Sequence, residues 1–131
     1  MKITIEIPET HMLNMLCNAS YRDYTALDGE LERAYKWVKE NPEAVSDLSM
    51  PDCWEPQVFA YLRGNAEHKI SIMDEYSDDV FDLTYASMCK AMELMAKEYP
   101  HHMNDLLSEN DDAITADVFL QLALFEDVIY G

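Results

Sequence analysis

Alternating apolar residues at the beginning of the chain predict a β-strand. Over residues 2–7 every second residue is isoleucine and the residues between are polar, as in a strand with one buried face. Pro8 ends this strand because proline cannot donate a hydrogen bond to a sheet. Thr10 can cap a short helix that follows, and the polar stretch 21–27 after it is predicted to be a loop. The apolar stripe of this helix is formed by Met12, Leu13, Leu16 and Cys17.

A second helix is predicted over residues 31–38, where apolar residues recur at i, i+3, i+4 and i+7. Thr25 together with Asp28, or Asp28 alone, can cap this helix. Asn41-Pro42 ends it, because proline cannot continue a helix at this position.

A β-hairpin is predicted around Gly64-Asn65, which lies between the β-rich runs 57–63 and 66–73. A Gly-Asn pair suits a two-residue type II′ turn, because glycine readily adopts the positive φ of the first turn position. In the second run, polar and apolar residues alternate as in a strand with one wet face. The alternating residues are Lys69, Ile70, Ser71 and Ile72.

The second half of the chain predicts three helices. An acidic run leads into a long helix over residues 79–99, where negative charge is favoured by the positive end of the helix dipole. Pro100 ends this helix, a short helix covers residues 101–108, and a last helix runs through Phe125. The last helix is apolar nearly all round, so it is expected to be buried or to be covered by another subunit.

These elements predict a single domain over residues 1–131 of the α+β class. Helix dominates, and the sheet is small, mostly antiparallel and three-stranded. The hydrophobic content of 49% and the aromatic content of 11% are those of a folded protein rather than of a disordered acidic tail.

Cysteine usage and hydropathy predict a location in the cytoplasm. Cys17, Cys53 and Cys89 are odd in number and form no CxxC pair, which favours reduced thiols over a disulfide framework. No signal peptide is recognisable, and no apolar run approaches the roughly 18 residues of a membrane span.

The formal net charge of −17 is the strongest constraint on what this chain binds. Residues 98–131 contain eight carboxylates and no lysine or arginine. Such a charge disfavours binding to DNA, RNA or an anionic membrane, and it favours a partner with a basic surface.

The sequence has no catalytic signature, and we predict that the protein is not an enzyme. The motifs GxSxG, GxGxxG, HExxH and the P-loop do not occur. His101 and His102 are adjacent, so their rings are expected to diverge, and Asp105 completes only a weak ligand pair with His101. We therefore predict no metal and no cofactor.

The chain resembles a group of small proteins encoded by bacteriophages and prophages. The similarity lies at both ends and covers roughly half of the chain. It includes the segments KITIEIPE, MLNMLCNA and YPHHMNDLLSENDDAITADVFLQLALFEDVIYG, and the part from Tyr99 on is the most specific. The chain departs from the group at Glu126, where the group typically has glycine. It also departs at residues 20–24, where the group has an aromatic Gly/Ser-rich segment. The resemblance implies an infected bacterial cytoplasm as the setting and supplies no catalytic residues.

Small size, acidity and the phage-like segments lead to one main hypothesis. In these properties the chain is similar to the inhibitors that phages use against restriction enzymes and CRISPR complexes. We expect an anti-CRISPR or anti-restriction inhibitor that binds the basic face of a host nucleic-acid-binding complex as a DNA mimic. The expected contact residues are Asp74, Glu75, Asp78, Asp79, Asp82, Asp105, Glu109, Asp111 and Asp112.

Two alternatives stay open from the sequence. One is a non-catalytic accessory or structural module that dimerises through the C-terminal helix, with the charge serving solubility. The other is a small-ligand-binding protein with a site around Tyr99, His101 and His102.

Overall fold

The computed structural model describes residues 9–18, 23–108 and 113–130. Within these ranges the chain forms six α-helices, one short 3-10 helix and one three-stranded antiparallel sheet. Of the described residues 61% are helical and 11% are in strands, which confirms the helix-dominant α+β class. The helical elements are α1 (Thr10–Asn18), α2 (Glu30–Glu40), η1 (Pro42–Val45), α3 (Trp54–Gly64), α4 (Tyr85–Glu98), α5 (Pro100–Leu107) and α6 (Ala113–Phe125).

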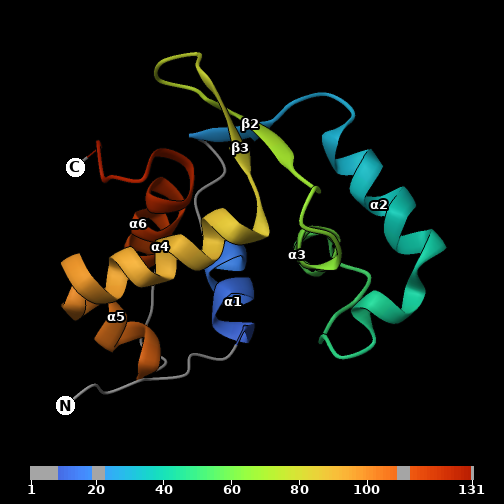
Figure 1. Cartoon of the computed structure of the whole chain (residues 1–131), viewed down its shortest axis with the longest axis horizontal. Helices are drawn as coiled ribbons and strands as arrows, with labels where there is room; N and C mark the ends of the chain where they lie inside the picture. Colours follow the sequence, from blue (N-terminus) through green and yellow to red (C-terminus); the bar gives the residue numbers. More distant parts are fainter. Residues whose placement is uncertain (1–8, 19–22, 109–112, 131) are drawn as a thin grey trace.

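The sheet lies at one end of the molecule, and the helices gather below and beside it (Figure 1). Its strands are β1 (Tyr24–Ala26), β2 (Ile70–Asp74) and β3 (Val80–Leu83), in the order β1-β2-β3. Both neighbouring pairs are antiparallel, and β2 and β3 form a hairpin. In β2 the alternation expected from the sequence is confirmed, because Ile70 and Ile72 are buried and Ser71 is not.

The first two predicted helices are confirmed, but one of their caps is not. The apolar stripe of α1 is buried at Met12, Leu13 and Leu16. The residue that precedes α2 is Gly29, in the left-handed conformation with φ of 86°, and no side chain caps this end. The cap expected from Thr25 and Asp28 is therefore wrong. The helix follows a glycine instead, which adopts the positive φ at this position without steric cost.

Of the three predicted strands, one is wrong and one is not tested by the structure. The predicted strand over residues 2–7 lies outside the described residues. Residues 57–63 belong to helix α3, so the expected hairpin around Gly64-Asn65 is wrong. A Cβ atom on Gly64 would lie 2.4 Å from the indole of Trp37, so this glycine permits close packing between α3 and α2 instead of forming a turn.

The two other strands of the sheet, β1 and β3, lie in segments that the sequence assigned to a loop and to a helix. The stretch 21–27, predicted as a loop, contains β1, whose partner β2 is distant in the sequence. The predicted helix over 79–99 begins only at Tyr85, after a capping box in which Thr84 and Ser87 exchange hydrogen bonds of 3.0 Å. The acidic run therefore forms the β2–β3 turn and β3, not the first turn of a helix.

The last helix, α6, is buried within its own chain. Nine of its residues are buried, and it packs against α1, α4 and β3. This confirms the prediction of a buried helix. No helix among the described residues is long and apolar enough to cross a membrane.

A strained residue follows α6. Glu126 has φ of 61°, a left-handed conformation that costs a residue with a Cβ atom about 1 kcal/mol relative to glycine. Its ion pair with Lys90, at 3.8 Å between exposed side chains, contributes little in return.

We therefore expect Glu126→Gly to raise the free energy of unfolding by about 1 kcal/mol in urea denaturation. The matched control is Asp127→Gly, because Asp127 is not among the residues with positive φ. This control is expected to give no stabilisation. An equal gain from both variants would contradict the strain at Glu126.

Candidate functional site

The turn between β2 and β3 is built around the buried carboxylate of Asp74. Asp74 is 1% exposed, and its carboxylate accepts hydrogen bonds from the backbone N–H of Tyr76 (3.0 Å), from the hydroxyl of Ser77 (2.9 Å) and from the hydroxyl of Tyr130. The Ser77 oxygen in turn accepts from the N–H of Asp79 at 3.2 Å. The side chain of one residue thus holds both the turn and the C-terminal segment.

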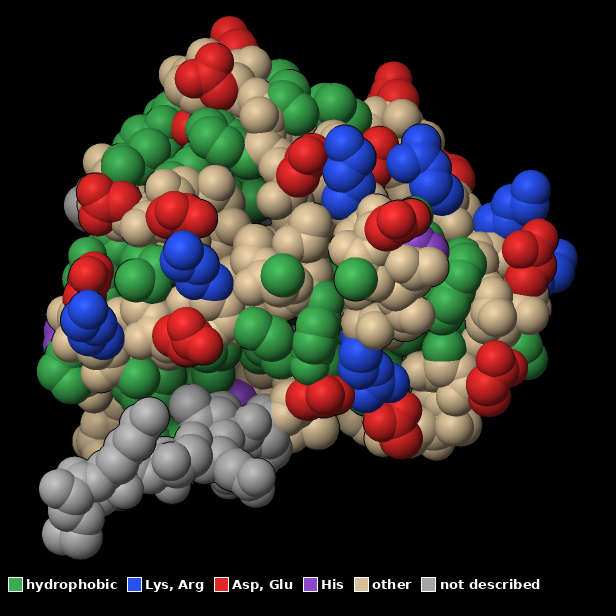
Figure 2. All heavy atoms as spheres, in the orientation of Figure 1, with side chains coloured by type: hydrophobic (Ala, Val, Ile, Leu, Met, Phe, Trp, Pro, Cys, Tyr) green, Lys and Arg blue, Asp and Glu red, His purple; other side chains and the backbone are tan. Residues whose placement is uncertain are grey.

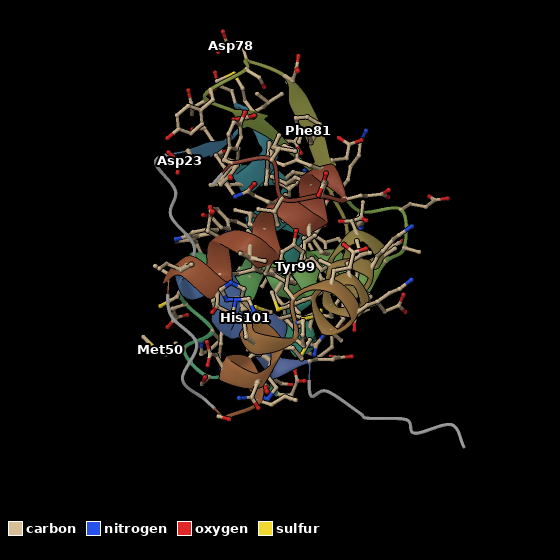
Figure 3. The ribbon with its side chains drawn as sticks, turned by 90° about the vertical axis from the view of Figure 1, so that its left-hand side faces the viewer. Asp23, Met50, Asp78, Phe81, Tyr99 and His101 are labelled. Atoms are coloured by element: carbon tan, nitrogen blue, oxygen red, sulfur yellow. The ribbon has the colours of Figure 1, made fainter. Side chains whose placement is uncertain are left out.

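Backbone hydrogen bonds complete the turn. The N–H of Asp74 donates to the carbonyl of Asp79 at 2.9 Å, and the N–H of Asp78 donates to the carbonyl of Asp74 at 2.8 Å. Asp78 has φ of 63°, a left-handed conformation that aspartate tolerates better than most residues. This single residue reverses the chain, so that its side chain lies at the tip of the hairpin (Figure 3).

Gln121 on α6 fixes the C-terminal segment against the hairpin. Its side chain is fully buried, and its Oε1 accepts from the N–H groups of Ile129 and Tyr130, both at 2.9 Å. Its Nε2 donates to Asp117 at 2.7 Å and to the carbonyl of Tyr130 at 3.2 Å. All four hydrogen-bonding positions of the amide are therefore used.

Three tyrosines lie among the carboxylates of this region. The rings of Tyr76 and Tyr130 are 4.9 Å apart between centroids. Burial, followed by the charges of Asp117, Asp23 and Asp74, raises the pKa of Tyr24. A hydrogen bond to Asp23 raises the pKa of Tyr76. The hydroxyl groups of Tyr24 and Tyr130 donate hydrogen bonds to Asp117 and Asp74.

The result is a surface on which acidic and apolar side chains alternate. Tyr76, Val80 and Ile129 are 67%, 50% and 52% exposed, and the carboxylates between them are exposed as well. The chain has no lysine or arginine from residue 70 to residue 89. Figure 2 shows acidic and hydrophobic side chains together at this end of the visible face. We call the following residues the hairpin-end surface: Glu75, Tyr76, Asp78, Asp79, Val80 and Ile129.

The structure sorts the predicted contact residues into different groups. Glu75, Asp78 and Asp79 are exposed on the hairpin-end surface. Asp74 is wrong as a surface contact, because its carboxylate is buried and bonded inside the fold. Asp82 on β3 is exposed but engages Lys69 at 3.3 Å.

Of the remaining predicted contact residues, the structure describes only Asp105, and Asp105 is not part of this surface. Asp105 is on α5, which lies at the opposite end of the molecule from the hairpin (Figure 1). Glu109, Asp111 and Asp112 lie outside the described residues. Asp78 and Asp82 are not helical, because Asp78 lies in the turn and Asp82 in β3.

The two adjacent histidines do not behave as expected. The rings of His101 and His102 are 4.1 Å apart between centroids instead of diverging, and Nδ1 of His102 lies 3.0 Å from the hydroxyl of Thr115. In the part of the chain that the structure describes, no three His, Cys, Asp or Glu side chains form a group suited to a metal ion.

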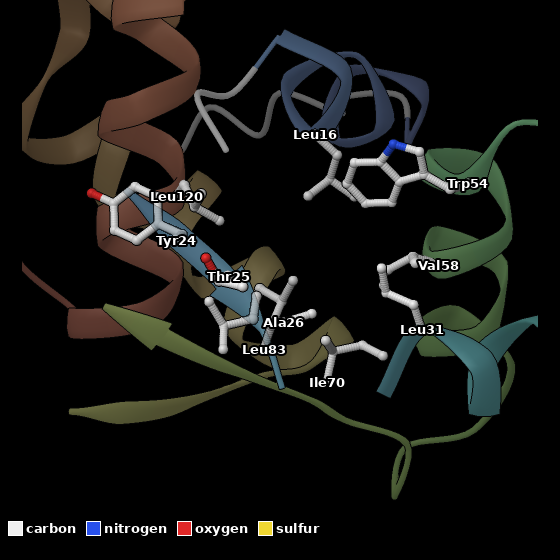
Figure 4. A pocket seen from close by; sticks show the side chains of 11 residues that line it. Leu16, Tyr24, Thr25, Ala26, Leu31, Trp54, Val58, Ile70, Leu83 and Leu120 are labelled. Atoms are coloured by element: carbon white, nitrogen blue, oxygen red, sulfur yellow. The ribbon is translucent and has the colours of Figure 1, made fainter. Parts of the chain in front are cut away.

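An apolar pocket of about 230 Å³ lies between the sheet and helices α1, α2 and α3 (Figure 4). Tyr99, His101 and His102, which the sequence suggested for a ligand site, are not among its lining residues. The pocket escapes sequence analysis because its lining comes from seven different elements, each of which contributes one to three residues. Its lining consists of Leu16, Tyr24, Thr25, Ala26, Leu31, Trp54, Val58, Ile70, Ile72, Leu83 and Leu120.

Comparisons with protein-family models, with curated proteins and with solved structures found no match. Function therefore has to be inferred from the two features that the geometry provides. The hairpin-end surface is suited to binding a basic partner, and the pocket is suited to an apolar molecule.

Acid is expected to weaken the hydrogen bonds around Asp74. Burial raises the pKa of Asp74, but the hydrogen bonds from Tyr130, the Tyr76 N–H and Ser77 lower it by more, so the pKa lies below its ordinary value. The ionised form thus stabilises the fold above about pH 4, and this contribution is lost as the pH falls through the lower folded-state pKa.

The difference in unfolding free energy between the native chain and Asp74→Asn tests this. It should be constant from about pH 7 to pH 5 and should shrink below about pH 4. A difference that stays constant down to about pH 3 would contradict a lowered pKa. Because both proteins carry almost the same remaining charge, general repulsion cancels in the comparison.

Gln121→Leu should destabilise the fold by about 2–4 kcal/mol, because two backbone N–H groups of the C-terminal segment lose their acceptor and the buried amide is replaced. Gln57→Leu is the control, since Gln57 makes one exposed hydrogen bond to the Pro51 carbonyl. Its expected cost is below about 1 kcal/mol. Similar unfolding midpoints for the two variants in urea would show that the amide does not hold the segment.

Proposed function

We propose that this protein is a non-catalytic inhibitor that binds the basic surface of a nucleic-acid-binding protein through its hairpin-end surface. The observation that carries the proposal is the set of three exposed carboxylates around an exposed tyrosine, in a 20-residue stretch (70–89) without a basic residue. The partner surface would be one that otherwise contacts the phosphates of DNA or RNA.

Electrostatics supports a basic partner. The net charge of −17 repels nucleic acid and anionic lipid and steers a positively charged surface toward the protein. Four of the seven basic residues that the structure describes are paired with carboxylates. Arg33 pairs with Glu30, Lys69 with Asp82, Lys90 with Glu126, and Arg63 with Glu9 and Asp47. Binding should therefore be fast at low salt and should weaken as the salt concentration rises.

The apolar members of the surface provide contact area that charge alone does not. Exposed aromatic residues are enriched in protein interfaces, and a tyrosine ring surrounded by carboxylates can stack on an arginine side chain of the partner. Tyr76 is an exposed tyrosine of this kind, and Val80 and Ile129 are exposed apolar residues of the same surface. Solubility alone does not account for this surface, because exposed apolar side chains do not increase solubility.

The turn is also ordered before binding. The buried Asp74 fixes the backbone of the turn, and the Thr25 hydroxyl donates to the carboxylate of Glu75. Fixed carboxylates lose less conformational entropy when a partner binds, which raises affinity.

The phage-like segments supply the biological setting for the proposal. Within an infected cell, the basic proteins that a small phage protein would most benefit from blocking are restriction and CRISPR complexes. We include inhibition of such a complex in the proposal.

Capture from a bacterial lysate tests the proposal. The protein is immobilised, lysate is applied at low salt, and bound proteins are eluted by rising salt and, separately, by added DNA. A nuclease or CRISPR component that DNA displaces would support the proposal. An eluate without nucleic-acid-binding proteins would contradict it.

Neutralisation of the hairpin then locates the contact. The triple variant Glu75→Gln, Asp78→Asn, Asp79→Asn should weaken binding to the captured partner at least tenfold and should flatten its dependence on salt. The control triple changes the same charge on exposed residues of α2 and η1, through Glu32→Gln, Glu40→Gln and Glu43→Gln. Equal losses in both triples would mean that overall charge, not this surface, governs binding.

A further inference from the structure

The apolar pocket extends from the molecular surface into the core. Its inner wall is formed by Ile70, Leu83 and Leu120, each at most 2% exposed. On its outer side, Thr25 is exposed, and Ala26, Leu31 and Trp54 are only half-buried. The labelled side chains surround an open central space (Figure 4). A small molecule can therefore enter between β1, α2 and α3.

The lining offers neither charge nor unused polar groups. No Asp, Glu, Lys, Arg or His is among the lining residues. The Tyr24 hydroxyl is directed to Asp117 at 3.4 Å, and the Thr25 hydroxyl donates to Glu75. Among the described residues, no buried side-chain nitrogen or oxygen lacks a hydrogen-bond partner. An ionised ligand would lose its hydration without compensation here, so the pocket selects neutral apolar molecules.

The size of the pocket sets the size of the molecule. Apolar cavities of about 150 Å³ stay dry and bind benzene. At about 230 Å³ this pocket has room for one further ring or a short alkyl chain. Protein interiors are otherwise close-packed, so an occupant restores contacts that these side chains lack.

We propose that the pocket between the sheet and helices α1–α3 is a binding site for a neutral, apolar small molecule of one or two rings. This site is separate from the hairpin-end surface, and it does not depend on the identity of the protein partner. The ligand class follows from the uncharged lining, the satisfied polar groups and the volume.

Methyl NMR of the labelled protein tests the site directly. Toluene and indole, both neutral, are titrated into the protein up to their solubility limits. We expect saturable shifts at the methyl groups of Leu16, Val58, Leu83 and Leu120 and little change elsewhere. Benzoate has a ring like that of toluene but carries a negative charge, and it should give at least tenfold weaker binding.

Two pocket-filling variants provide the specificity control. Ala26→Leu and Val58→Phe add side-chain volume at two walls of the pocket and should weaken toluene and indole binding at least tenfold. Ala96→Leu makes the same change as Ala26→Leu at an exposed position of α4 and should leave binding unchanged. Spectra of each variant first establish that it is folded, and the second filling variant serves if the first does not fold.

Three outcomes would overturn the proposed site. The absence of saturable shifts in the native protein would overturn the site. So would unchanged binding in a folded filling variant, or benzoate binding as tightly as toluene does.

Discussion

The buried carboxylate of Asp74 is the interaction on which the acidic end of this molecule depends. It is one of 26 acidic residues in a chain with only nine lysines and arginines. It is not part of the exposed charge, because it bonds to the turn, to Ser77 and to Tyr130 inside the fold. Without it the turn residues would lack their common acceptor, and the C-terminal segment would lose one of its attachments.

This arrangement divides the acidic residues into two physical roles. Asp74 and Asp117 are acceptors that organise hydroxyl and amide groups around them, which offsets the cost of keeping them charged near the core. Glu75, Asp78 and Asp79 remain at the surface and gain no comparable internal partners, apart from the Thr25 bond to Glu75. Mutual repulsion among exposed carboxylates opposes folding, and a basic partner would relieve it.

Local patterns in the sequence predicted much of the helical framework. The stripes of α1 and α2 are readable from spacing, whereas the short helix was predicted from its place after Pro100 and the buried α6 from its nearly uninterrupted apolar run. Spacing failed for α3, which is buried on nearly all sides and so lacks a polar face that would reveal its period. It failed again for β1, whose three residues become a strand only by pairing with β2.

The candidate site was predictable only in part, for similar reasons. The density of acidic residues indicated the region of the β2–β3 turn. The sequence did not show that Asp74 is buried while its neighbours are exposed, or that Asp105 lies on a distant helix. Tyr76, Tyr130 and Gln121 carried no signal in the sequence, since their roles arise from contacts between segments far apart in the chain. The apolar pocket likewise exists only through the meeting of the sheet with several helices.

Backbone ¹⁵N relaxation across the β2–β3 turn tests most directly whether the acidic surface is ordered in the free protein. Residues 75–79 should have order parameters close to those of helix α4, about 0.85, because Asp74 holds both sides of the turn. Values below about 0.6 would show a flexible acidic loop, and they would contradict a preformed binding surface.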